Sequence, residues 1–325
     1  MSAPPCRFSI VETDAPIELL PRDITAYRAG NCGVDYVHRI DSGVEGSELT
    51  LVALTHGNEI CGANALLYLL EHDIRPVQGA LTLVFANPAA YQNFDPQRPF
   101  ASRCLDEDMN RSWQQACLDN PQTREAHRAR ELRPYIEAAD SVLDLHSTSH
   151  AVAPMLIYPD NHRNRGFADR LDYPFPHLLY DLDSYHTGML ISHHERTAPA
   201  GASIVAECGQ HFSHAATEQA IAVTLRFIAG HNMLDSAQVL PEWSHAPDHS
   251  AGHYRIDRVL AAETEQFRFI EPFKGFERFA KGELIAVDDQ QLVAAPFDNC
   301  ALIMPARVPV AGEEVVTLAE YLDRS

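Results

Sequence analysis

The chain lacks the features of several common protein classes. Its 25 lysines and arginines are outnumbered by 45 aspartates and glutamates, which gives a formal net charge of −20. Because a phosphate backbone requires basic surface, nucleic acid is not expected as a partner. The longest apolar run, Ala65–Leu70, is far too short to cross a bilayer, so we expect no membrane association either.

Cysteine pairs and common catalytic motifs are also missing. The seven cysteines are odd in number and form no C-x-x-C, so a disulfide framework is not expected. The segment Met1–Arg7 has neither the basic region nor the apolar core of a signal peptide, and a reducing cytoplasm is the expected location. The absence of G-x-S-x-G and P-loop motifs argues against serine hydrolases and NTPases.

Strand-like and helical segments alternate over the first two-thirds of the chain. Apolar runs predict strands at Leu49–Leu54, Leu81–Ala86, Ser141–His146, Met155–Tyr158 and Ser203–Glu207. Helical spacing predicts helices at Ala63–Glu71, His214–Ile228 and from an Asn120-Pro121 cap towards Ala139, with Pro134 kinking or splitting the last one. This alternation predicts an α/β fold with a mixed, mostly parallel sheet flanked by helices.

The texture of the sequence changes after about residue 235. Pro241–Gly252 is rich in Pro, Ser, His and Gly, as linkers are. Short runs separated by turn signals follow, which predict a small antiparallel β domain. We therefore expect two domains, a larger one at 1–235 and a β-rich one at 236–325.

The tetrad His56-Gly57-Asn58-Glu59 is the most informative motif. It lies between a predicted strand and a predicted helix, where open α/β sheets place their ligands. An imidazole and a carboxylate so spaced can bind one metal ion, and zinc takes both ligand types. A helix start with an incidental histidine is the alternative, since a carboxylate also favours the helix dipole.

A third ligand candidate, His146, ends another predicted strand. A close ligand pair with one distant ligand is a common layout for catalytic zinc, whose fourth position is left for water. Asp144 lies on the same face as His146 by strand alternation. It can accept a hydrogen bond from the imidazole, or it can simply lie at the end of the sheet.

Two further segments carry candidate chemistry. Arg103 can stabilise an oxyanion, and Asn110 with Arg111 can hold a carboxylate, although a solvated loop would look the same. Glu207 ends a predicted strand and can transfer protons beside zinc, or it can be an ordinary acid at a strand end.

Four motifs in order resemble one family. H-G-N-E, then R…D-M-N-R, then D-L-H and a strand-end E-C-G-Q are similar to the succinylglutamate desuccinylase/aspartoacylase family of zinc-carboxypeptidase-like hydrolases. The resemblance covers the segment up to residue 235, and the β-rich remainder also suits the family. It implies one Zn²⁺ per chain, bound by His56, Glu59 and His146.

The resemblance also implies roles for the other candidates. Glu207 would be the general base and then the acid, Arg103 would stabilise the tetrahedral oxyanion, and Asn110 with Arg111 would hold the α-carboxylate. Met109 replaces the usual leucine of D-L-N-R, which should be harmless.

The expected activity is zinc-dependent hydrolysis of an N-acyl amino acid, such as N-succinylglutamate or N-acetylaspartate. The alternatives are a zinc carboxypeptidase acting on short peptides and a metal-binding protein with an inactive site. A small molecule is the expected partner, and a homo-oligomer is left open. Length and the β-rich region favour a desuccinylase-like substrate.

Overall fold

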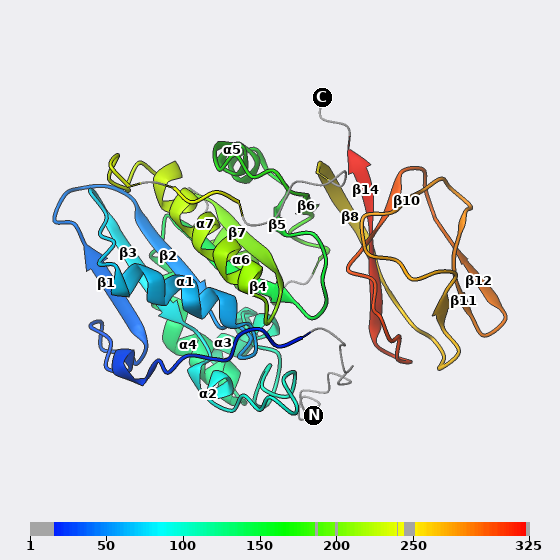
Figure 1. The fold of residues 1–325 in the computed structure, drawn as a ribbon, viewed down its shortest axis with the longest axis horizontal. Coiled ribbons are helices and arrows are strands. Elements are labelled where there is room, and N and C mark those ends of the chain that lie inside the picture. Colours follow the sequence, from blue (N-terminus) through cyan, green and yellow to red (C-terminus); the bar gives the residue numbers. More distant parts are fainter. Residues whose placement is uncertain (1–15, 186–187, 199–200, 239, 244–250, 323–325) are drawn as a thin grey trace.

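The computed structural model describes residues 16–185, 188–198, 201–238, 240–243 and 251–322. Among them, eleven strands form one sheet in the order β1-β3-β2-β4-β7-β5-β6-β8-β14-β13-β10 (Figure 1). These strands are β1 (Val37–Asp41), β2 (Glu48–Ala53), β3 (Ala80–Phe85), β4 (Ser141–Thr148), β5 (Met155–Pro159), β6 (His177–Tyr180), β7 (Ser203–Gln210), β8 (His253–Ala261), β10 (Arg278–Phe279), β13 (Cys300–Ile303) and β14 (Glu314–Leu322).

The helices lie around the first half of this sheet. They are α1 (Ile60–Glu71), α2 (Pro88–Tyr91), α3 (Gln115–Asp119), α4 (Arg124–Glu137), α5 (His162–Arg170), α6 (Leu190–Thr197) and α7 (His214–Gly230), with the 3₁₀ turns η1 (Thr25–Tyr27) and η2 (Met109–Arg111). Strands β3, β2, β4 and β7 are parallel, whereas β1 pairs antiparallel with β3, and β5 pairs antiparallel with β7 and parallel with β6. The predicted mixed, mostly parallel sheet flanked by helices is therefore confirmed.

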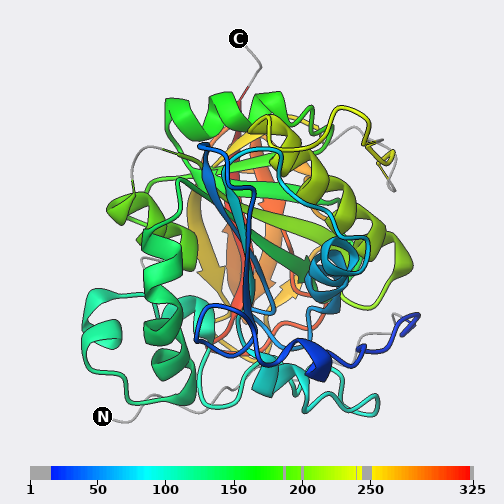
Figure 2. The same cartoon turned by 90° about the vertical axis from the view of Figure 1, so that its left-hand side faces the viewer.

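Strand alternation places two of the three apolar cores of the described residues on opposite faces of the main sheet, and the third lies in the C-terminal part. In β2, Leu49 and Leu51 belong to the core that includes α1 and α7, whereas Val52 belongs to the core that includes α4 and α6. Figure 2 shows these helix pairs on opposite sides of the sheet. The strands are covered on both faces, which explains their nearly continuous apolar sequences.

The start of α4 differs from the prediction. Asn120 ends α3, and Thr123 is the N-cap of α4, where its side chain accepts a hydrogen bond from the amide of Ala126. Asn120-Pro121 has the residue types of an N-cap and a first helical position. The helix Arg124–Glu137 begins directly after Thr123, however, so Thr123 is its N-cap. Pro134 lies inside α4 and does not split it.

The C-terminal part is β-rich, as predicted, and continues the main sheet. Strand β8 pairs parallel with β6 and antiparallel with β14. Three further strands, β9 (Arg268–Phe269), β11 (Leu284–Asp288) and β12 (Gln291–Ala294), form a separate antiparallel sheet. Since one sheet passes through both parts, the division at residue 235 remains a prediction.

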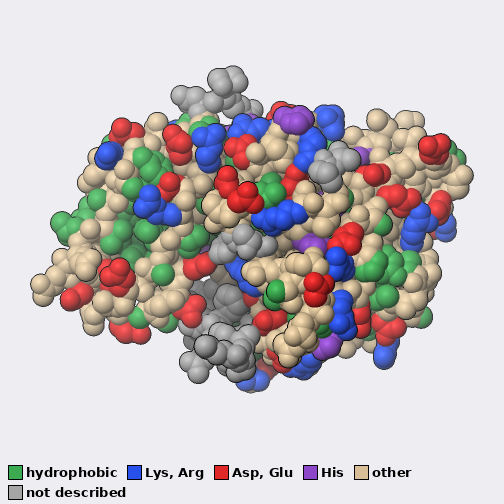
Figure 3. Space-filling view, turned by 180° about the vertical axis from the view of Figure 1, so that it is seen from behind, with side chains coloured by type: hydrophobic (Ala, Val, Ile, Leu, Met, Phe, Trp, Pro, Cys, Tyr) green, Lys and Arg blue, Asp and Glu red, His purple; other side chains and the backbone are tan. Residues whose placement is uncertain are grey.

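The surface of the C-terminal part is more apolar than the rest of the face in Figure 3. Ile270, Leu292 and Val308 are among its well-exposed large hydrophobic side chains. No helix within the described ranges is long and apolar enough to cross a membrane.

The cysteines only partly follow the expectation from sequence. Five are free thiols: Cys32, Cys61, Cys117, Cys208 and Cys300. Cys104 is disulfide-bonded, but this does not make a framework of the kind that supports small secreted domains.

Candidate metal centre and active site

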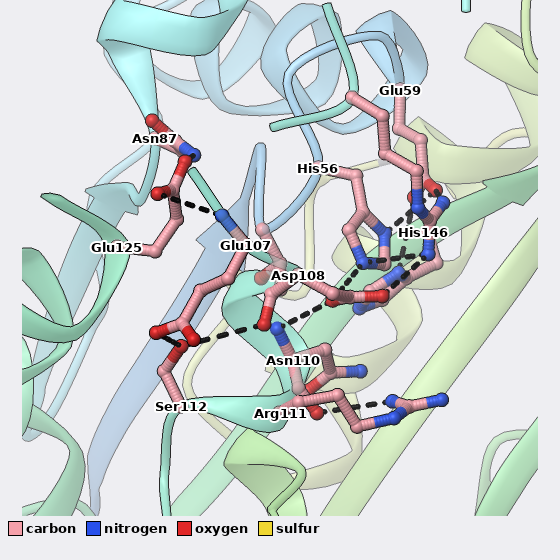
Figure 4. Close-up of polar contacts among 12 residues, drawn as sticks. His56, Glu59, Asn87, Glu107, Asp108, Asn110, Arg111, Ser112, Glu125 and His146 are labelled. Carbon is pink, nitrogen blue, oxygen red and sulfur yellow. Dashed lines mark hydrogen bonds and ion pairs between the residues drawn. The ribbon is translucent and has the colours of Figure 1, made fainter. Parts of the chain in front are cut away.

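Two imidazoles and one carboxylate converge at the carboxyl ends of β2 and β4 (Figure 4). His56 Nδ1 lies 2.8 Å from Glu59 Oε1, and His146 Nδ1 lies 3.0 Å from Glu59 Oε2. Potential ligand atoms of the three residues all lie within 4.8 Å of one another. All three side chains are buried. The structure thus brings together the three metal ligands predicted from sequence.

The parallel pairing of β2 with β4 explains this meeting. The chain leaves β2 through Leu54, which has a left-handed φ of 63°, and enters α1 with Glu59 as its N-cap residue. The next strand, β4, runs in the same direction, so His146 reaches the same edge of the sheet. The set fits zinc, because imidazole nitrogen and carboxylate oxygen are ligands of catalytic zinc sites.

Gly57 allows a second loop to approach this turn closely. A Cβ atom here would lie 2.4 Å from the carbonyl oxygen of Ser102 and 2.5 Å from the amide nitrogen of Tyr91. The Gly57 amide donates a hydrogen bond to the carbonyl of Arg103 at 2.9 Å. A side chain would separate the turn from the loop, so the glycine sets the distance between the ligands and Arg103.

Acidic side chains contact the outer nitrogens of both imidazoles. Asp108 Oδ1 lies 2.8 Å from His56 Nε2, and Asp144 Oδ2 lies 2.8 Å from His146 Nε2. Thr55 donates a hydrogen bond to the other oxygen of Asp144. Carboxylates in such positions orient ligand imidazoles and increase their basicity. Asp144 contacts His146 at ion-pair distance, but neither of the two atoms has a hydrogen-bond partner in the described structure, so its orienting role stays a prediction.

The charges in this cluster are strongly coupled. Burial alone would raise the pKa of Glu59, but the imidazoles of His56 and His146 hold it well below its usual range. Burial would likewise lower the pKa of His146, but Asp144 and Glu59 hold it well above the ordinary value. The cluster therefore favours an ionised Glu59 carboxylate beside a protonated His146, and a metal cation at this position would likewise favour the ionised carboxylate.

Glu207 lies beside the cluster on β7, in register with His146 on β4. Its residue surface is partly accessible from the cavity, whereas its Oε2 atom is buried without a hydrogen-bond partner in the described structure. Burial raises the pKa of Glu207 to about 8, and the nearby Glu59 carboxylate contributes in the same direction. A carboxyl group in this position can hold or release a proton near neutral pH.

The arginines are held by different partners. Arg103 donates from Nη1 to Glu59 and from Nη2 to Asp108, each at 3.1 Å, so it is fixed against the cluster. Arg111 is exposed, and its guanidinium donates to the carbonyl of Asn110 at 3.1 Å. Asn110 is buried, and its side-chain oxygen accepts from the amide of Leu190 at 3.0 Å. The solvated-loop alternative therefore does not describe this segment.

A cavity of about 360 Å³ connects these residues. It is lined by the seven candidate residues and by others from β4, β5, β7 and the C-terminal strands. The walls include Asn58, His150, Ile157, Tyr185, Met189, Val205, His211, Val259, Met304, Glu314, Val316 and Thr317. Its volume suits one small molecule, since ligand sites commonly occupy about 300–1,000 Å³.

Several features of the site were not identified from sequence. Asn58 lies in the cavity wall with neither side-chain polar atom bonded to a described residue. Glu125 is 1% exposed, and its carboxylate accepts hydrogen bonds from the amides of Leu105, Asp106 and Glu107. Asn87 donates to the same carboxylate (Figure 4). Glu125 thereby fixes the loop between Arg103 and Asp108.

Three other buried histidines form hydrogen bonds with groups other than the metal-ligand candidates. His193 bonds to Glu137, and His194 bonds to Ser203 and the carbonyl of Ala139, so this pair is structural. His211 lines the cavity and bonds to Ser147 through Nδ1. Burial lowers the pKa of His211 to about 3, which keeps its imidazole neutral.

Comparison with known proteins identifies relatives of the chain. Residues 45–232 match the model of the succinylglutamate desuccinylase/aspartoacylase catalytic domain. A Mus musculus protein named N-acyl-aromatic-L-amino acid amidohydrolase (carboxylate-forming) is 36% identical over 120 residues, which cover 33% of this chain and 35% of that protein. The match thus spans about a third of the length of this relative.

Solved structures share the fold over most of the chain. A succinylglutamate desuccinylase from Vibrio cholerae has a TM-score of 0.65 at 15% identity, covering 89% of this chain and 86% of its own. A succinylglutamate desuccinylase/aspartoacylase from Rhodobacter sphaeroides has a TM-score of 0.64 at 16% identity, covering 97% of this chain and 100% of its own. At these identities the likeness concerns the fold.

Proposed function

We propose, because this chain belongs to the succinylglutamate desuccinylase/aspartoacylase family, that it hydrolyses the amide bond of an N-acyl amino acid with one zinc ion. The observation that carries the proposal is the convergence of His56, Glu59 and His146 in a cavity that Glu207 and Arg111 also line. The name of the mouse relative favours an acyl amino acid over a peptide as substrate.

In this proposal, His56, Glu59 and His146 hold the zinc ion. Bound zinc polarises the amide carbonyl and lowers the pKa of water to about 7. The carboxylates of Asp108 and Asp144 keep the two imidazoles oriented, because each contacts the ring nitrogen that faces away from Glu59.

The remaining residues act on the substrate. Arg111 and Asn110 hold its α-carboxylate, and a guanidinium can make two parallel hydrogen bonds to such a group. Glu207 takes the proton of the attacking water at its carboxylate and delivers it to the departing amine nitrogen. Arg103 stabilises the oxyanion that forms on the carbonyl carbon, since its contacts with Glu59 and Asp108 fix its position beforehand.

An assay of metal content and amide hydrolysis tests the proposal. The protein is assayed for amine release from N-acyl amino acids and from short peptides, before chelation, after chelation and after return of Zn²⁺. His146→Asn should lose both metal and activity, whereas His72→Asn, at an exposed histidine on the end of α1, should keep both. Faster cleavage of peptides would favour a carboxypeptidase, and bound zinc without turnover on any substrate would favour an inactive site.

A further inference from the structure

We infer that the substrate carries a single carboxylate, and that its side chain and its acyl group are both uncharged and largely apolar. The inference rests on the proposed amide hydrolysis and names the substrate class of the same site. It follows from the distribution of charge in the cavity wall.

Apart from the proposed zinc ion, the cavity offers one cationic side chain to a substrate carboxylate. Arg103 and Arg111 are the only lysine or arginine residues in its wall as far as the structure describes it. Arg103 is already paired with Glu59 and Asp108, both of them largely buried. The guanidinium of Arg111 is exposed to the cavity with a backbone carbonyl as its recorded hydrogen-bond acceptor. One arginine can neutralise one carboxylate, and the α-carboxylate occupies it.

The histidines of the wall are not available as a second cation for the substrate. His56 and His146 face the Glu59 carboxylate. His150 is partly buried, and burial is the main cause of a lowered pKa, with nearby Arg307 acting in the same direction. Arg307 itself is exposed and is not part of the cavity wall.

The rest of the described wall carries no further cation and consists of apolar, neutral polar and acidic side chains. Ile157 and Val205 come from β5 and β7, and Val259, Met304 and Val316 come from the C-terminal strands and their connections. Glu207 and Glu314 add further carboxyl groups to this wall. A second carboxylate would lose water against apolar side chains without a cationic partner, and an unpaired buried charge is strongly unfavourable.

This excludes the two substrates in the family name. N-acetylaspartate carries two carboxylates and N-succinylglutamate carries three. The inference therefore reverses the sequence-based preference for a desuccinylase-like substrate. An apolar N-acyl amino acid, such as N-acetylleucine or N-acetylmethionine, satisfies Arg111 with its α-carboxylate and places only uncharged groups against the wall.

Matched substrates of equal shape test the inference. N-acetylleucine and N-acetylaspartate differ mainly in whether two methyl groups or two carboxylate oxygens branch from the same carbon. N-(4-methylpentanoyl)leucine and N-succinylleucine make the same comparison in the acyl group. We expect kcat/KM to be about 30-fold or more higher for the uncharged member of each pair, as fits an unpaired charge that costs roughly 2 kcal/mol or more. Equal or faster cleavage of the charged member would overturn the inference, whereas failure of all four would instead refute the proposed hydrolysis.

Variants of the C-terminal wall provide a second test. Met304→Lys adds a cation at a half-buried position. It should lower the ratio of kcat/KM for N-acetylleucine to kcat/KM for N-acetylaspartate about tenfold. Met304→Gln, which adds no charge, should leave this ratio unchanged. Val259→Lys repeats the test at a second half-buried position, in case the first variant does not fold. Leu292→Lys adds the same charge at a residue that is 72% exposed on β12 and should leave the ratio unchanged. An unchanged ratio in folded Met304→Lys and Val259→Lys would remove these side chains from the substrate wall and overturn the inference.

Discussion

The two sides of the cavity differ in how they are built. One side consists of the carboxyl ends of parallel strands and carries ionisable side chains close together: His56, Glu59, His146 and Glu207. The other side comes from antiparallel strands β8, β13 and β14 and presents mostly apolar groups such as Val259, Met304 and Val316.

We therefore expect the polar side to govern the chemical step and the apolar side to govern which substrate is preferred. The polar side is constrained from several directions at once, because Glu59 contacts two imidazoles and Arg103 contacts both Glu59 and Asp108. A change there should affect turnover of every substrate. The apolar side has few such links, so a change there should alter which substrate is preferred while the chemical step remains intact.

The largest expected effect is on the polar side, at Glu207. Glu207→Gln keeps the size of the side chain but removes the proton acceptor, so kcat should fall about 10²–10⁴-fold. The bound metal should remain, because Glu207 is not one of the three ligands. Steady-state kinetics with metal analysis measures both. Turnover within a few-fold of the wild type would exclude Glu207 as the base.

Arg111 should affect binding more than the chemical step. Arg111→Met removes the proposed partner of the α-carboxylate, and the loss of a charged, two-pronged hydrogen bond should lower kcat/KM about 10–100-fold, mainly through KM. The control is Arg98→Met, at an arginine whose side chain is 69% exposed and which pairs with Asp95 outside the cavity wall. An unchanged KM for Arg111→Met would contradict the assignment.

Glu125 should have a smaller, indirect effect as a positioning residue. Glu125→Gln leaves fewer acceptor sites for the amides of Leu105, Asp106 and Glu107, so Arg103 should be held less well and kcat should fall roughly tenfold. If Glu125 acts through Arg103, this loss should largely disappear in an Arg103→Ala background. Additive losses would instead indicate a general structural role. The control is Asp106→Asn on the same loop, which weakens an exposed ion pair with Arg124.

The smallest expected effect concerns stability and lies outside the cavity. Burial lowers the pKa of His231, which follows α7, to about 4. As the pH falls, His231 would therefore be protonated first in the unfolded chain. The contribution of the neutral, buried imidazole to folding stability should be lost as the pH falls from about 6.5 towards 4. His231→Phe should reduce the pH dependence of the urea midpoint in that window and leave kcat at pH 7 unchanged. An unaltered pH dependence would show that His231 does not contribute.

The sequence predicted the polar side well because each ligand follows a recognisable strand. Leu49–Leu54 and Ser141–His146 are apolar runs, and parallel pairing places their carboxyl ends together. The family resemblance then connected Arg103, Asn110 and Glu207 with the same edge, and the structure places all three in the cavity wall.

The apolar side was much harder to predict. Strand β14, Glu314–Leu322, combines strand formers at Val315–Thr317 with Leu, Ala and Glu, which are good helix formers, so its local preference is mixed. Its pairing with β8 and β13 depends on contacts distant in sequence. Glu125 was missed for a related reason, since an acid in the first turn of a helix is common and its loop partners lie about twenty residues earlier.

The continuity of the sheet limits how this protein can be shortened or rearranged. Strand β6 has β5 on one side and β8 on the other, and both neighbours pair with it in parallel. Ending the chain at residue 235 would leave β6 as an open edge, which invites association with other chains, and would remove one wall of the substrate cavity. The C-terminal region therefore cannot be exchanged between relatives as a detachable module, and hybrids should be joined within loops that leave the β6–β8 pair intact.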